Sequence, residues 1–152
     1  MLSLQDEFAP NNRCFGCGPK NDKGLRIKSF VDSDRVVAHF TPESHHLAFE
    51  GMLNGGICGT LLDCHSNWCA AYHIMKKRNE SAPPCTVTAE FSVKLLKPTP
   101  MNAVLTLEAS PIEVTEKKAI IDACIKANGD VTATCRGVFV AVREGHPAYH
   151  RW

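Results

Sequence analysis

Residues 51–78 read GMLNGGICGTLLDCHSNWCAAYHIMKKR, and this stretch decides the fold class of the 152-residue chain. Apolar or weakly polar side chains recur in it every three or four residues, at Ile57, Leu61, Cys64, Trp68, Tyr72 and Met75. This spacing predicts one stripe of a long amphipathic helix from Asn54 to Met75. Asn54 is a good N-cap, and the basic run at 76–78 suits the negative end of the helix dipole.

Downstream of this helix the period of the sequence changes to two. After Pro83-Pro84, polar and apolar side chains alternate from Thr86 to Leu95, which indicates a half-buried strand. Two more strand candidates, 104–114 and 118–127, follow. Asn128-Gly129 then marks a tight hairpin into a last strand at 131–142.

Upstream of the helix, residues 25–31 and 35–40 are short strand candidates on either side of Asp32-Ser33-Asp34, a plausible hairpin turn. The chain therefore reads as two strands, one long helix and four strands with short connections. Such an order favours an α+β fold in which an antiparallel sheet of about five to six strands wraps the central helix.

Composition and charge exclude several classes of protein. Apolar residues make up 44% and charged residues 22% of the chain, which is ordinary for a globular protein. Lysine plus arginine is 17 and aspartate plus glutamate 16, so a general nucleic-acid binder is not expected. No apolar run is long enough to span a membrane, and MLSLQDEFAP lacks a signal pattern. We expect a cytoplasmic single domain over residues 1–152, with a loop segment at 1–23 and a tail at 143–152.

Two chemical features meet at the start of the expected helix. Gly55, Gly56 and Gly59 cost roughly 1 kcal/mol each relative to alanine, which suggests that something approaches this backbone closely. Free N–H groups at such a helix start form a site for an oxyanion. Asp63 lies off the apolar stripe, one turn before Asn67, and could activate water or attack a carbonyl. Alternatively, Asp63 faces solvent and the glycines only let the helix pack close to the sheet.

The glycine-to-acid spacing resembles that of the hotdog-fold thioesterases, particularly the phenylacetyl-CoA thioesterase-like branch. That branch reads Gly-x-x-His-Gly-Gly, then six residues, then Asp or Glu, and residues 51–56 with Asp63 have this spacing. The strand at 87–98, the hairpin at 128–130 and the front piece Cys14-Phe15-Gly16-Cys17-Gly18 also resemble family segments. The resemblance covers residues 13–142. It implies a hotdog fold and a hydrolase that cleaves an acyl-CoA to free acid and coenzyme A without a cofactor.

The resemblance also implies a role for each matching position. Gly55 would supply the N–H that polarises the thioester carbonyl, and Gly56 would help to form the turn. Asp63 would be the nucleophile or the general base for water. Asn67 would hold that water, and Thr88 would face the site from its strand.

Two positions depart from the family pattern. Asn54, which we group with the substrate-binding residues, stands where histidine is usual, and Ala48 stands where some relatives carry Gln or Asn. His45 and His46 lie close to Ala48 in sequence. The departures leave a non-catalytic acyl-CoA-binding hotdog protein as the alternative. A hydratase would need a catalytic histidine, which Asn54 removes.

Cys14 and Cys17 form the one pair with a motif spacing among eight cysteines. A single CxxC pair cannot fill a tetrahedral zinc site, so we expect structural thiols and no bound metal. Without a signal pattern, all eight thiols are expected to be reduced.

The remaining conspicuous residues have ordinary interpretations. The histidines lack metal-ligand spacing and are expected on the surface or in loops. Lys76-Lys77-Arg78 reads as a solvated helix end or, alternatively, as a holder of coenzyme A phosphates. Trp152 of the tail could dock on a partner subunit or be loose.

Helix geometry predicts an active site shared between two chains. Gly55 and Asp63 are eight residues apart in sequence, which is about 12 Å along a helix at 1.5 Å per residue. A thioester carbonyl whose oxygen accepts a hydrogen bond from the Gly55 N–H has its carbon within roughly 4 Å of that nitrogen, and the attacking atom must stand about 3–3.5 Å from the same carbon. One helix cannot easily satisfy both distances. A two-fold related copy with antiparallel helices can, so we expect a homodimer or a dimer of dimers.

Overall fold

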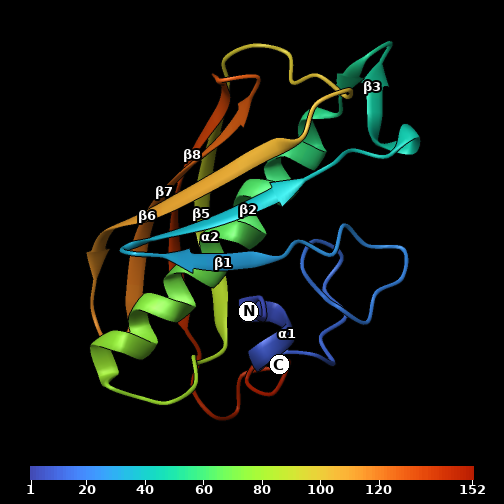
Figure 1. The fold of residues 1–152 in the computed structure, drawn as a ribbon. Coiled ribbons are helices and arrows are strands. Elements are labelled where there is room, and N and C mark those ends of the chain that lie inside the picture. The colour runs from blue at the N-terminus through green and yellow to red at the C-terminus, as the bar shows by residue number, and fades with distance from the viewer.

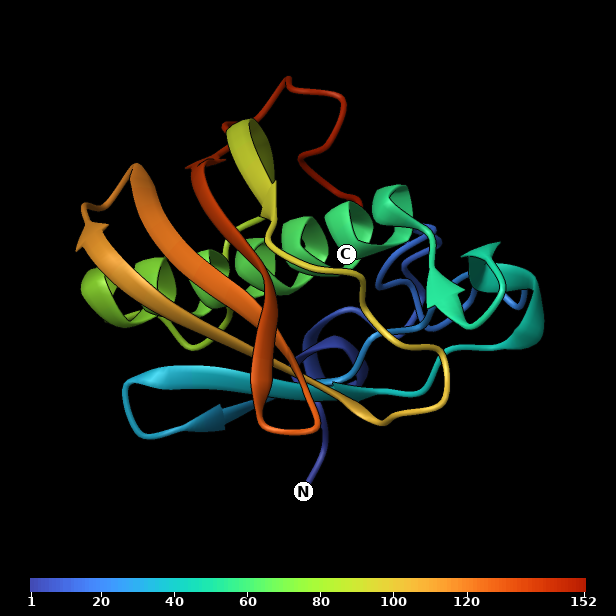
Figure 2. The same cartoon turned by 90° about the horizontal axis from the view of Figure 1, so that it is seen from above.

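A long central helix, α2 (Gly55–Arg78), lies across one face of a six-stranded antiparallel sheet (Figures 1 and 2). The computed structural model describes residues 1–152. The strand order is β1 (Ser29–Asp32), β2 (Arg35–Phe40), β6 (Leu105–Val114), β7 (Lys118–Ala127), β8 (Asp130–Ala141) and β5 (Thr86–Leu95). The α+β fold expected from the sequence is confirmed.

Helix α2 starts and ends on the caps that its sequence indicates. The Asn54 side chain accepts a hydrogen bond from the Ile57 N–H at 3.1 Å, as an N-cap should. Asn79 adopts a left-handed φ of 55° and donates its N–H to the last carbonyls, at Lys76 and Met75. The predicted helix is therefore confirmed and extends three residues beyond Met75.

The strands agree with the sequence patterns except at the front of the chain. Residues 118–127 form β7 over the expected range, and Asn128 and Gly129 have the positive φ values of a tight hairpin, 52° and 84°. The strand expected at 25–31 instead starts at Ser29. Residues 25–28 run as irregular chain because their amides bond to the front loop, with Leu25 N donating to Phe15 O at 2.8 Å.

Short elements complete the fold on the side of α2 that faces away from the sheet. The front loop lies there against Cys64, and the C-terminal tail lies there against Trp68, while helix α1 (Leu4–Phe8) lies beside the edge strand β1 (Figure 1). A 3-10 turn at Ser44–His46 leads into a small hairpin, β3 (Leu47–Phe49) with β4 (Met52–Leu53), beside the start of α2. None of the helices combines the length and the hydropathy that a membrane crossing requires.

The core surrounds α2: it fills the space between the helix and the sheet and, on the other face of the helix, the space under the front loop and the tail. Its largest fully buried side chains include Trp68, Leu61, Leu62, Ile74, Phe139, Leu105, Ile121 and Ile125. The middle of α2 is buried almost all round, because the front loop and the tail cover the face that the sheet does not.

The edge strand β5 departs from simple alternation through a bulge. Its register against β8 shifts between Thr88 and Glu90. A bulge inserts one extra residue, so the alternation of inward-facing and outward-facing side chains shifts by one residue after it. Thr88 therefore faces α2 before the bulge, while beyond it Val93 packs on the core and Leu95 reaches Gly55. The expected half-burial of β5 is wrong beyond the bulge, because the side chain of Leu95 stays 57% exposed in the single chain.

His65 belongs to the core, which corrects the expectation that the histidines lie on the surface or in loops. Its Nε2 lies 2.9 Å from the carbonyl of Val36, which can only accept, so Nε2 carries the proton. Its Nδ1 lies 2.8 Å from the Ser29 hydroxyl, which donates to it. Burial lowers the pKa of His65 to about 4.

We expect the free energy of unfolding to fall as pH drops from about 6.5 to about 4. In this window the unfolded chain takes up a proton at His65 and the folded chain does not. The contribution of His65 to the free energy of unfolding is fully present above the pKa that this residue has in the unfolded chain. It is lost as pH falls toward the pKa of His65 in the folded chain, a change of roughly 3 kcal/mol. Urea unfolding at pH 7 and pH 4.5 measures it.

The His65→Gln variant should lose most of this pH dependence. His46 and His73, whose pKa values burial also lowers, contribute to the remainder, as do the shifted carboxylates Asp6, Asp63 and Asp122. An equally steep dependence in the variant would show that His65 does not carry the effect.

Candidate active site

Asp63 is half-buried on α2 and faces the first part of β5. The Thr88 hydroxyl donates a hydrogen bond to Asp63 Oδ1 at 2.5 Å. Burial raises the pKa of Asp63, against the opposing effect of the Thr88 hydrogen bond. The structure thus brings together the two residues that the sequence analysis assigned to one site. Asp63 is not the solvent-facing residue of the alternative interpretation.

Asn67 lies one helical turn after Asp63, in a buried polar layer between α2 and β5. Its Nδ2 donates to the carbonyl of Thr86 at 3.5 Å, while its Oδ1 has no partner in the chain. The Ser66 and Thr86 hydroxyls are also buried without partners. Buried polar atoms are normally hydrogen-bonded, often through ordered water. The Asn67 Oδ1 atom is therefore available to hold a water molecule near Asp63.

The start of α2 forms a second group of site residues. Gly55 opens the helix, so its N–H has no partner within the helix. An apolar cleft of 360 Å³ borders it, lined mainly by hydrophobic side chains of β3, β4 and the end of β5: Phe49, Met52, Leu53, Leu95 and Leu96. A polarised carbonyl bound at Gly55 would have apolar surroundings for the rest of its acyl group.

The three glycines of α2 have different surroundings. A Cβ atom on Gly55 would lie 2.9 Å from the end of Leu95, and one on Gly56 would lie 3.0 Å from Asn54 Oδ1. A Cβ atom on Gly59 would meet nothing within 4 Å. Close packing inside the chain therefore does not account for Gly59.

The structure does not bring the two groups of site residues together within one chain. Asn54, Gly55 and Gly56 lie at the first turn of α2, whereas Asp63 and Asn67 lie in its middle. The helix is continuous between them, which keeps Gly55 and Asp63 about 12 Å apart along its axis.

The tail supplies site neighbours that the sequence analysis missed. Arg151 donates to the Thr86 carbonyl at 2.7 Å, and its charge offsets part of the rise that burial causes in the pKa of Asp63. Trp152 stacks on Trp68, with ring centroids 4.3 Å apart. The sequence left open whether Trp152 docks on a partner subunit or is loose. In the structure it does neither, because it packs on α2 of its own chain. No local pattern announces this contact, because it depends on how the tail folds back over α2.

Neither histidine near Ala48 turns toward the site. His46 Nδ1 accepts a hydrogen bond from the Glu43 N–H at 3.0 Å, and its ring stacks on Phe40. His45 is exposed, as is Ala48 itself. Compensation for Ala48 by these side chains therefore has no support in the geometry.

The basic run that ends α2 lies at the opposite end of the helix from Gly55. Arg78 donates to the Glu116 carbonyl at 2.7 Å, and Lys76 and Lys77 are exposed. This arrangement favours a solvated helix end.

Comparison with known proteins supports the fold. No family model matches the sequence, and no curated protein matches it. Among solved structures, a thioesterase superfamily protein from Shewanella loihica PV-4 is 29% identical. The match covers 77% of this chain and 91% of that one, with a TM-score of 0.65. The chain has the hotdog fold of thioesterase superfamily proteins.

Two further hotdog structures illustrate the range of this similarity. A hypothetical thioesterase from Streptococcus pneumoniae TIGR4, solved with coenzyme A, is 19% identical over 76% of this chain and 85% of its own, with a TM-score of 0.63. A putative thioesterase from Ralstonia eutropha JMP134, a phenylacetic acid degradation-related protein, is 16% identical over 77% and 86%, with a TM-score of 0.64. At these identities the two structures share the fold alone. The hotdog fold expected from residues 51–63 is confirmed.

Proposed function

We propose that this hotdog protein is an acyl-CoA thioesterase. One observation carries the proposal: Asp63, half-buried and hydrogen-bonded by Thr88, lies on a helix whose glycine-rich start borders an apolar cleft. A carboxylate base and an N–H donor for an oxyanion are the two groups that acyl hydrolysis requires. The thioesterase superfamily fold supports the same chemistry.

Each site residue has a defined role in this reaction. The Gly55 N–H polarises the thioester carbonyl, and Asn54 and Gly56 shape the turn that presents it. Asp63 either takes a proton from a water that attacks the carbonyl carbon, or attacks that carbon directly to form a mixed anhydride that water then hydrolyses. In both routes the C–S bond breaks, coenzyme A leaves as the thiol and the acyl group leaves as the acid. Thr88 orients Asp63 through its hydrogen bond.

The apolar cleft beside Gly55 is our candidate for the acyl site. Five large hydrophobic side chains line it, and Gly55 lies at its edge, where the carbonyl must sit. The Streptococcus pneumoniae relative was solved with coenzyme A, which supports a coenzyme A thioester as the substrate class.

We also propose that the active site forms between two chains of a homodimer, alone or within a dimer of dimers. Gly55 and Asp63 are too far apart on one helix to act on one thioester. Gly59 faces open space between them. Nearby, Phe91 of the edge strand β5 is 42% exposed and Leu95 is 57% exposed. A partner helix packed antiparallel across Gly59 would cover these groups and bring its Asp63 to this Gly55.

The proposed location is the cytoplasm. No disulfide links any of the eight cysteines, including Cys14 and Cys64, whose sulfur atoms lie 3.7 Å apart. Reduced thiols persist in the cytosol and not in oxidising compartments.

A panel of acyl-CoA thioesters with short, long and aromatic acyl groups tests the proposed function. We expect hydrolysis of at least one of them. The released acid should be followed by chromatography, because the protein's own thiols would react with a thiol reagent. Tight acyl-CoA binding by calorimetry without turnover would instead support the non-catalytic binding protein. The histidine-to-asparagine departure at Asn54 is the feature that favours this second candidate.

A further inference from the structure

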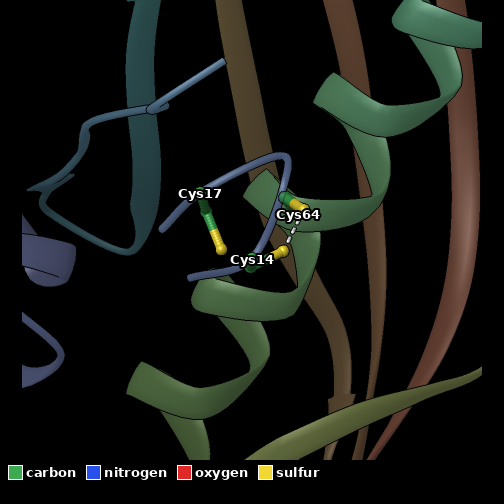
Figure 3. A group of neighbouring side chains, drawn as sticks. All are labelled: Cys14, Cys17 and Cys64. Carbon is green, nitrogen blue, oxygen red and sulfur yellow. Dashed lines mark hydrogen bonds between the residues drawn. The ribbon is translucent and has the colours of Figure 1, made fainter. Parts of the chain in front are cut away.

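Three cysteine sulfur atoms meet beside α2. Cys14 and Cys17 come from the front loop and Cys64 comes from the helix (Figure 3). All three Sγ atoms lie within 4.8 Å of one another, and those of Cys14 and Cys64 are 3.7 Å apart. The sequence analysis expected no metal because one CxxC pair offers only two ligands. The fold adds a third thiol that is 50 residues away in sequence from Cys14, which removes that premise.

The spacing of these sulfur atoms suits a zinc ion. Zn²⁺ binds thiolates at about 2.3 Å in tetrahedral geometry, which places neighbouring sulfur atoms about 3.8 Å apart. The Cys14–Cys64 separation of 3.7 Å matches this value. A disulfide would join only two of the three sulfur atoms, and at about 2.05 Å.

The front loop is built to present both of its sulfur atoms to the helix. A Cβ atom on Gly16 would lie 2.3 Å from Cys64 Sγ, and one on Gly18 would lie 2.4 Å from the backbone nitrogen of Cys14. Only glycine fits at either position. The Gly18 N–H donates to the Cys14 carbonyl at 2.8 Å, which closes the turn around the two cysteines.

A buried N–H donor without a partner lies next to the cluster. Trp68 is completely buried, and its indole N–H has no hydrogen-bond partner in the chain. This N–H lies beside the Cys17 thiol. Metal-bound thiolates commonly accept such outer hydrogen bonds, which tune the site and orient its ligands.

We propose that Cys14, Cys17 and Cys64 bind one Zn²⁺ as thiolates. No histidine or carboxylate joins the three sulfur atoms, so a water molecule or another small ligand takes the fourth position. Binding releases the three thiol protons. The ion fastens the front loop to α2 next to Asp63, and this role does not depend on thioesterase activity.

Zinc content of the purified protein tests the proposal. After purification with a reducing agent and without chelator, mass spectrometry should find close to one zinc per chain. Cys14→Ser and Cys64→Ser should each lower this to less than about a tenth. Cys124→Ser is the matched control, because Cys124 is half-buried on β7 outside the cluster, and it should retain zinc.

Cobalt binding to the wild-type chain gives a readout that does not depend on any variant folding. Reduced, chelator-stripped protein titrated with Co²⁺ should develop the thiolate-to-cobalt charge-transfer absorption with a one-to-one end point, and Zn²⁺ should abolish it. Stripping zinc should lower Tm by about 5 °C or more, and Zn²⁺ but not Mg²⁺ should restore it.

Two results would overturn the proposal. One is a wild-type protein without the site: in reduced form it holds less than a tenth of an equivalent of zinc and gives no cobalt charge-transfer band, or it is isolated with a disulfide among these cysteines. The other is folded Cys14→Ser and Cys64→Ser protein that binds as much zinc as the wild type.

Discussion

Asp63→Asn is expected to lower kcat for acyl-CoA hydrolysis by about 10²–10⁴-fold. Asparagine keeps the size of the side chain and can still meet the Thr88 hydroxyl, but it can neither accept a proton from water nor attack a carbonyl. The acyl cleft and Gly55 are untouched, so KM should change little. Steady-state kinetics on the best substrate of the acyl-CoA panel measures both constants.

Asp122→Asn provides the matched control for Asp63→Asn. Asp122 lies on β7, where it pairs with Arg136 at 2.6 Å on the exposed side of the sheet. Its replacement makes the same chemical change and should leave kcat unchanged. Folding of both variants is checked by circular dichroism and Tm. A folded Asp63→Asn protein with wild-type kcat would exclude Asp63 as the base or nucleophile.

Gly55→Leu is expected to reduce kcat/KM by about 100-fold or more, a loss typical of disabling an oxyanion donor. The new side chain would stand at the edge of the apolar cleft, where the proposed mechanism places the thioester carbonyl. Its contact within the chain is the flexible end of Leu95, so the fold should tolerate it. The kinetic assay and size-exclusion chromatography measure activity and assembly. A fully active variant would remove Gly55 from the site.

Features of the fold that depend on neighbours in sequence are predictable without a structure. The Asn54 cap and the spacing of the apolar stripe are sufficient to predict α2, because capping and amphipathicity act over a few residues. Residues 118–127 and the Asn128-Gly129 turn predict the β7–β8 hairpin for the same reason. The glycine-to-acid spacing in turn led to the correct fold family.

Features that depend on tertiary contacts are not predictable in this way. The bulge in β5 changes which side chains face α2, and alternation alone does not mark it. The burial of His65 requires partners on β1 and β2. Cys64 joins Cys14 and Cys17 only because the front loop folds against the helix. A search for cysteines that are close in sequence therefore misses this third thiol. The packing of Trp152 on Trp68 is equally non-local.

In the proposed mechanism, Asp63 of one chain acts on a thioester held at Gly55 of another. Asp63→Asn and Gly55→Leu chains that are unfolded together and co-refolded test this shared site. Half of the resulting dimers should be mixed, and each mixed dimer holds one intact site, so the mixture should recover about a quarter of wild-type activity. Each variant refolded alone should stay inactive. Mixed dimers, verified by orthogonal affinity tags and still inactive, would contradict the shared site, as would a fully active monomer.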